Sequence, residues 1–475
     1  MTILFRNVEV EGRPGQSVLV RAGTVREVGP PEAVARGAEP DQVIDGAGGV
    51  LLPGLHDHHI HLFALAARAE SFWCGPPDVT GAQSLVDALR ETSRARRDRD
   101  WLRGVGWDDT VIGWPDRHDL DRAVADRPIR LQHRSGALWV LNSAALARLD
   151  LDLDPDPPPG LERDDAGVPT GRLFGADAWL AARLGGGPPD LAHTGRTLAA
   201  HGVTGVTDAT AHNGVTELDE LARQHRDGRL PQRITAMTAP RVDHAAAGIA
   251  IGPVKIVLAE RDLPDRRDLV HTIRTAHDDH RPVAIHAASH VTVVYAVTAL
   301  ADAGPRSRDR LEHASVVPPD LVRPLARLGA TVVTQPHFLA EHGDRYRRTV
   351  DPADRPWLYR GRVFLDNGIP LAGGSDAPVG GVDPFAVMRA AVDRRSTDGR
   401  TLAPEESLQP EEALALFTGD PEDPGGRPRR VRVGRVADLC LLDRPWSEAR
   451  DRLDRRMVRA TIIDGQLVHD REGDR

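Results

Sequence analysis

Six residues of this chain have side chains that can bind metal ions or activate water, although they are spread over more than 300 positions. They are His59, His61, Lys255, His286, His313 and Asp376. His59 and His61 stand two residues apart, so an extended backbone would point both imidazoles to one face. Because histidine is the commonest metal ligand in proteins, two convergent rings form half of a metal site. With 20 histidines in 475 residues, such a pair alone is also expected roughly once by chance.

Lysine usage adds a second signal. The chain has 61 lysine and arginine residues, and Lys255 is its only lysine. All other basic positions of the chain are arginine, so a single lysine suggests a role that arginine cannot fill. Burial can deprotonate the lysine amine and make it a nucleophile. The alternative is a residual surface lysine, but the apolar neighbours in Pro253-Val254-Lys255-Ile256-Val257-Leu258 favour a buried strand.

The chemistry of this residue set is that of a hydrolase. Neutral imidazoles and one carboxylate can bind one or two divalent ions, and a lysine that has captured carbon dioxide becomes a carbamate that can bridge two of them. Two ions about 3.5 to 4 Å apart lower the pKa of a shared water and supply hydroxide at neutral pH. Asp376 can bind one ion, accept the proton as the hydroxide attacks, and deliver it to the leaving nitrogen. We therefore expect hydrolysis of an amide-like bond.

These residues need elements that bring them together, and the middle of the chain predicts such elements. Short apolar runs alternate with amphipathic stretches, which is typical of βα units around a parallel sheet. The candidate strands are Val50–Leu55, Thr204–Thr207, Ile234–Met237, Val254–Leu258, Val283–Ile285, Arg310–Glu312, Thr331–Thr334 and Pro370–Ala372. Eight such units predict an α/β fold, a (β/α)8 TIM-like barrel, whose strand ends converge on one face.

Two further parts are expected around the barrel. Residues 1–50 and 425–475 are rich in β-strand signals, with Ala22-Gly23 and Asp464-Gly465 as hairpin turns, and predict one small β-sandwich domain built from both termini. The barrel then occupies 51–424. Its long insertion after the first strand, residues 70–195, is expected to form a cap.

Composition excludes some partners. A net charge of -9 argues against nucleic acid, which needs a basic surface. The two cysteines, Cys74 and Cys440, give no disulfide framework and fit a reducing compartment. No run reaches 18 apolar residues, and the first residues do not form a signal peptide, so we expect a cytoplasmic protein with no membrane partner. The sequence leaves open whether the chain forms a homo-oligomer.

The motifs around the six residues resemble those of the metal-dependent amidohydrolase superfamily, in particular the branch called amidohydrolase family 3, which includes N-substituted formamide deformylases. The resemblance runs over nearly the whole chain. It rests on Pro53-Gly54-Leu55-His56-Asp57-His58-His59-Ile60-His61, Gly106-Trp107-Asp108, Val254-Lys255-Ile256, Ile285-His286-Ala287, Leu311-Glu312-His313-Ala314 and Gly374-Ser375-Asp376-Ala377-Pro378. It implies the barrel, a hydrolase of non-peptide C–N bonds, and a divalent metal, with zinc expected and one or two ions left open. Lys255 matches the strand that carries a carboxylated lysine in the family.

Three residues are candidate contacts of a small-molecule substrate. Gln335 and His337 follow the seventh candidate strand, with a plain loop as the alternative, and Trp107 lies in the insertion, where packing is the alternative. Two other functions remain. An esterase or lactonase would use the same hydroxide, and an inactive scaffold similar to the collapsin response mediators would keep the barrel and lose ligands. Here all six ligand positions are filled.

Overall fold

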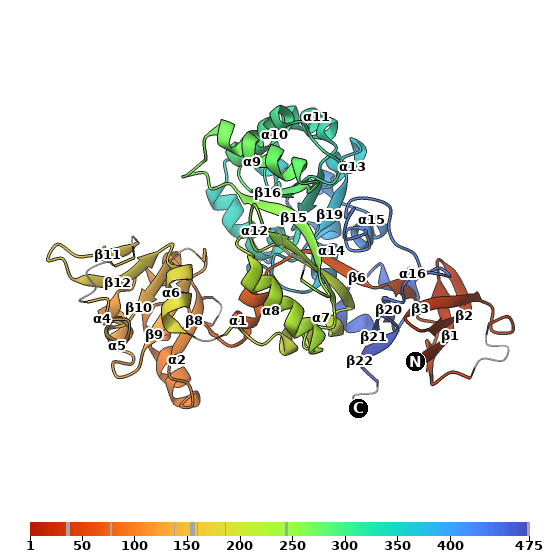
Figure 1. Cartoon of the computed structure of the whole chain (residues 1–475), viewed down its shortest axis with the longest axis horizontal. Helices are drawn as coiled ribbons and strands as arrows, with labels where there is room; N and C mark the ends of the chain where they lie inside the picture. Colours follow the sequence, from red (N-terminus) through yellow and green to blue (C-terminus); the bar gives the residue numbers. More distant parts are fainter. Residues whose placement is uncertain are drawn as a thin grey trace. The chain divides into compact units, whose positions relative to one another are not determined.

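The computed structural model describes residues 1–34, 39–76, 78–136, 138–152, 157–158, 160–185, 187–242 and 246–472 (Figure 1). The chain divides into two compact units. One comprises 1–62 together with 190–475, and the other comprises 63–189. The six candidate ligands all belong to the first unit.

Eight parallel strands of the first unit form the barrel, and seven of the eight candidate regions overlap one of them, whereas the first shares only Leu55 with its strand. In order around the sheet they are β6 (Leu55–Ile60), β13 (Val203–Asp208), β14 (Arg233–Thr238), β15 (Ala250–Val257), β16 (Val283–Ala287), β17 (Arg310–His313), β18 (Thr331–Thr334) and β19 (Leu371–Gly373). The first and last strands meet just past their carboxyl ends, where His59 O accepts from Asp376 N at 2.7 Å and Ala377 O accepts from His61 N at 2.9 Å. The predicted TIM-like barrel is therefore nearly closed.

Helices follow most of these strands, as the βα pattern predicts. They are α7 (Ala192–Ala200), α8 (Val215–Arg226), α9 (Arg266–Asp278), α10 (His290–Ala303), α11 (Pro319–Leu328), α12 (His337–Thr349), α13 (Arg362–Asp366), α14 (Pro384–Asp393) and α15 (Pro410–Ala415). Two of them show how their starts are fixed: Ser289 caps α10 by accepting from Thr292 N, and Asp265 caps α9 by accepting from Arg267 N.

The first barrel strand differs from its prediction. The sequence predicts one strand over Val50–Leu55, but β5 (Leu51–Pro53) pairs antiparallel with β20 (Leu439–Leu442), and the barrel strand β6 begins only at Leu55. Every residue of β6 is buried, including three histidines and an aspartate. Strands of a parallel barrel are covered on both faces. Such a strand can still contain polar residues when each of them has a binding partner or a functional role. Because these residues are polar, a prediction based on apolar runs does not detect this strand.

The two ends of the chain form two four-stranded sheets. One contains β1 (Thr2–Val10), β2 (Arg13–Arg21), β3 (Thr24–Gly29) and β4 (Gln42–Asp45); the other contains β5, β20, β21 (Val458–Ile463) and β22 (Gln466–Asp470). Both sheets contribute to one buried apolar cluster, with Phe5 from the first and Ile462 from the second. The hairpin turns Ala22-Gly23 and Asp464-Gly465 have positive φ at both residues, as tight two-residue hairpins require. A short helix, α16 (Trp446–Ala449), lies between β20 and β21.

The insertion folds around a sheet of its own. Its strands are β7 (Phe72–Trp73), β8 (Leu102–Trp107), β9 (Ile129–His133), β10 (Leu138–Leu141), β11 (Leu161–Arg163) and β12 (Pro169–Phe174). Its helices are α2 (Ala82–Ala95), α3 (Asp109–Ile112), α4 (Arg117–Asp121), α5 (Ser143–Arg148) and α6 (Asp177–Leu184), and α1 (Leu62–Ala69) leads into it. Its role as a cap stays a prediction. Among the described residues, no helix combines the length and apolar character needed to cross a membrane.

Candidate metal centre

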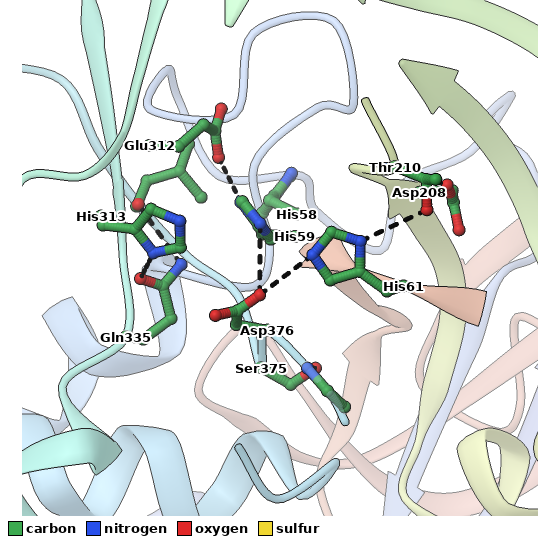
Figure 2. A network of polar contacts seen from close by, with 12 residues as sticks. His58, His59, His61, Asp208, Thr210, Glu312, His313, Gln335, Ser375 and Asp376 are labelled. Atoms are coloured by element: carbon green, nitrogen blue, oxygen red, sulfur yellow. Dashed lines mark hydrogen bonds and ion pairs between the residues drawn. The ribbon is translucent and has the colours of Figure 1, made fainter. Parts of the chain in front are cut away.

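Three of the six candidate ligands converge closely at the carboxyl end of the barrel. His59 Nε2 lies 3.4 Å from Asp376 Oδ1, and His61 Nε2 lies 3.2 Å from the same oxygen (Figure 2). The ligand atoms of all three residues lie within 4.8 Å of one another. Two imidazole nitrogens and a carboxylate oxygen form a donor set that suits a divalent ion such as zinc.

Each of three rings is held through its other nitrogen. His59 Nδ1 lies 2.5 Å from Glu312 Oε2, His313 Nδ1 lies 2.8 Å from Gln335 Oε1, and His61 Nδ1 lies 3.3 Å from Thr210 Oγ1. The Glu312 carboxylate can only accept, so Nδ1 of His59 carries a hydrogen, and Nε2, which faces Asp376, is the nitrogen that could bind a metal. Histidines that bind metal are held in this way, and the residues present therefore fit a metal ion.

Two of the ligand residues depend on an unusual backbone. Neighbouring residues of a regular strand point to opposite faces. Glu312 and His313 are neighbours, yet both side chains contact the His59 ring. His313 has φ of 72° and Asp376 has φ of 49°, in the left-handed region that non-glycine residues rarely adopt. Such strain persists where the surrounding structure imposes it, which is typical of functional sites.

His286 extends the cluster on the side of β16. Its ring centroid lies 4.3 Å from that of His313, and the His313 centroid lies 4.8 Å from that of His59. Burial lowers the pKa of His286 to about 4 and the pKa of His313 well below its usual value. Both rings are therefore neutral near pH 7, which is the form that binds metal.

Lys255 lies in β15 and is buried, as its sequence context predicts. Its Nζ atom has no hydrogen-bond partner among the described residues. Burial lowers the pKa of Lys255, while the Glu312 and Asp376 carboxylates act in the opposite direction. An orphaned, buried amine with a lowered pKa has the character that carbamate formation needs.

The sequence profile of the amidohydrolase family matches residues 42–469. The chain belongs to the amidohydrolase family. It is similar to the N-substituted formamide deformylase of Arthrobacter pascens, with 26% identity over 98% of this chain and 97% of the relative.

Two solved structures share this amidohydrolase fold. One is an uncharacterized metal-dependent hydrolase from Pyrococcus horikoshii, with a TM-score of 0.75 and 20% identity over 99% of this chain and 100% of the other. The other is the atrazine chlorohydrolase TrzN from Arthrobacter aurescens in complex with zinc, with a TM-score of 0.53 and 16% identity over 99% of this chain and 96% of the other. At these identities the likeness concerns the fold alone.

The three candidate substrate contacts of this amidohydrolase have different surroundings. Gln335 is fully buried and holds His313. His337 is buried, and neither ring nitrogen has a partner among the described residues. Trp107 is fully buried in the core of the insertion and donates its Nε1 hydrogen to Gly113 O at 3.1 Å. These surroundings favour packing for Trp107 and ring positioning for Gln335; a substrate contact stays a prediction for all three.

The sequence reading assigned no role to Glu312 or Arg310. Arg310 donates from Nε to Glu312 Oε1 at 2.7 Å, and both side chains are buried. Burial by itself would raise the pKa of Glu312, but Arg310 and His59 lower it below its usual value, so the carboxylate is charged. The available signal was two opposite charges at alternating positions of β17.

Proposed function

We propose that this chain hydrolyses a C–N bond of a small molecule, in an amide, a formamide or a cyclic amide, at a centre that binds one or two divalent ions. The observation that carries the proposal is the convergence of the ligand atoms of His59, His61 and Asp376 within 4.8 Å. Membership of the amidohydrolase family supports the hydrolase class. The similarity to a formamide deformylase supports the bond type.

The proposed ligands are His59, His61, Lys255, His286, His313 and Asp376, with zinc as the expected metal. When bound, a divalent ion would lower the pKa of a coordinated water toward 7 and supply hydroxide near neutral pH. The neutral rings of His286 and His313 and the Nδ1 contacts of His59 and His61 support this ligand set.

Lys255 is proposed to act as a carbamate. Its neutral amine would attack the carbon of carbon dioxide, form an N–C bond and release one proton. The product is an anion whose two oxygens can reach two cations. The unpartnered Nζ atom and the lowered pKa of Lys255 support this role, because only a neutral amine can attack.

Asp376 is proposed to move the proton. Its carboxylate would accept a proton from the attacking water and return it to the leaving nitrogen. Burial by itself would raise the pKa of Asp376, but the adjacent His59 and His61 rings lower it well below its usual value, so the carboxyl is deprotonated before the reaction. Its left-handed backbone fixes the carboxylate against both rings.

A substrate panel with metal analysis tests this function. The purified chain should contain one or two divalent ions, and a chelator should abolish turnover that added zinc or manganese restores. N-formyl, N-acyl and cyclic amides should each be assayed beside the matching ester or lactone. Turnover of amides over esters supports the proposal, whereas turnover of esters alone assigns an esterase or lactonase. A chain without bound metal, and without rescue by added metal, overturns it.

A further inference from the structure

A buried ion pair on β17 contacts the strand that carries His59 and His61. Arg310 and Glu312 alternate on β17, so both side chains point to the same face of that strand. Arg310 Nη2 donates to His58 O at 2.6 Å, and Glu312 Oε2 contacts His59 Nδ1 at 2.5 Å. The strands β17 and β6 are not neighbours in the sheet. The pair therefore ties the middle of the barrel to the strand that carries His59 and His61.

The contacts of Glu312 are divided between two partners. Oε1 accepts from Arg310 Nε at 2.7 Å, while Oε2 faces His59 and lies 3.2 Å from Arg310 Nη2. The guanidinium thus holds the carboxylate through both of its oxygens, and one of these oxygens meets the imidazole. Glu312 and Arg310 are 0% and 1% exposed, so both side chains are shielded from bulk solvent.

This acceptor distinguishes His59 from the other rings of the centre. His61 and His313 meet the neutral oxygens of Thr210 and Gln335 (Figure 2). Of these three rings, only His59 meets a charged oxygen through Nδ1. A carboxylate behind an imidazole fixes its tautomer and raises its basicity as a metal ligand.

We infer that Arg310 and Glu312 are positioning residues that make His59 a stronger imidazole donor than His61 and His313. This inference rests on the proposed function, because it concerns the affinity of the same centre for a divalent ion. In this view β17 does more than supply His313. Its Arg310 and Glu312 also set the orientation and the donor strength of His59, which lies on a strand across the barrel.

The test compares Glu312→Gln with the wild type by metal binding rather than by turnover. The change keeps an oxygen near His59 but removes the charge. Apparent Kd values for Co²⁺ come from competition with a chelator, and the visible absorption of bound Co²⁺ reports its coordination. Loss of a carboxylate behind a metal-binding histidine typically weakens affinity by about 10- to 100-fold. We expect a loss of that size and an altered Co²⁺ spectrum.

A matched control comes from a second ion pair with a buried carboxylate. Glu406 is 1% exposed, accepts from Arg360 Nε at 2.7 Å, and contacts none of the candidate ligands among the described residues. Glu406→Gln removes the same charge and should leave the Kd for Co²⁺ unchanged. An equal loss in both variants would assign the effect to general destabilisation and overturn the inference.

Two further outcomes separate the inference from the proposed function. Unchanged Co²⁺ affinity in a folded Glu312→Gln variant overturns the inference and leaves the proposed function standing. A wild type that binds no Co²⁺ overturns the proposed function itself. If Glu312→Gln does not fold, Glu312→Asp keeps the charge while withdrawing the oxygen from His59, and we expect a smaller loss in the same direction. Equal affinity in Glu312→Asp then counts against the inference.

Discussion

At the scale of single residues, the chemistry of this amidohydrolase depends on which side chains are neutral and which are charged. Burial keeps His286 and His313 neutral, and it favours the neutral form of Lys255. Asp376 and Glu312 stay charged because histidine or arginine groups face them. Neutral donors and one reactive carboxylate are what the proposed reaction requires.

Substitution of Lys255 tests the carbamate. We expect Lys255→Ala to lose activity and to regain part of it when small carboxylic acids are added with metal, because they supply the missing oxygens. Lys255→Arg should also fail, since a guanidinium stays protonated and cannot take up carbon dioxide. Steady-state kinetics with and without acetate measures this. Wild-type rates in the arginine variant would refute the carbamate.

Substitution of Asp376 tests the proton transfer. Asp376→Asn keeps an oxygen donor beside His59 and His61 but cannot accept the proton, so the variant should retain much of its metal and lose turnover by roughly 10²-fold or more. Metal analysis and kcat, measured on the same sample, separate the two effects. A variant that loses metal and turnover in proportion would assign Asp376 to binding alone.

At the scale of elements, the site depends on how β6 and β19 meet. Gly374 lies where the last strand closes on the first, and a Cβ added there would be 2.5 Å from His59 Cβ and 2.7 Å from His59 N. Real Cβ atoms do not approach backbone so closely, so any side chain here must push the strands apart. The glycine is a requirement of closure and of the position of His59.

Gly374→Ala should therefore disturb both stability and metal binding. Overpacking of this kind costs about 1–3 kcal/mol, and movement of His59 should weaken affinity for Co²⁺. Gly187→Ala is the control, because a Cβ at Gly187 would meet nothing within 4 Å. Denaturant unfolding and Co²⁺ titration measure both effects. An alanine variant that equals the wild type in both would show that closure tolerates a side chain.

At the scale of the whole molecule, buried neutral histidines couple stability to pH. Burial lowers the pKa of His337 to about 4, whereas an unfolded histidine titrates near 6.5. Above pH 6.5 neither state binds the proton. As the pH falls from 6.5 toward 4 only the unfolded state binds it, so the free energy of unfolding decreases.

His337→Leu should reduce this loss. For a single group with these pKa values the loss between pH 7 and pH 5 is on the order of 2 kcal/mol, and leucine removes it without leaving a polar group unpaired. Urea unfolding of the metal-free protein at both pH values gives the difference. If variant and wild type lose the same stability at pH 5, the His337 ring is protonated in the folded state.

Much of the fold could be predicted because local sequence patterns, the apolar runs and their spacing, indicate its strands. The apolar runs of β13 to β19 and their spacing indicate the barrel, and each of these seven predicted regions overlaps its strand. The first barrel strand was predicted at the wrong residues because β6 is buried although most of its side chains are polar. It therefore contains no apolar run that could mark it in the sequence. The boundaries of the terminal β domain, at residues 50 and 425, and of the insertion, at residues 70 and 195, stay predictions.

The sequence by itself determined the six candidate ligands, because histidine spacing, a single lysine and family motifs lie in the order of the residues. Only the tertiary structure decided how they are held. Arg310 and Glu312 meet His58 and His59 across more than 250 positions, and Gln335 meets His313 from the next strand. Such contacts depend on barrel closure and on the left-handed backbone at His313 and Asp376, which no local pattern encodes.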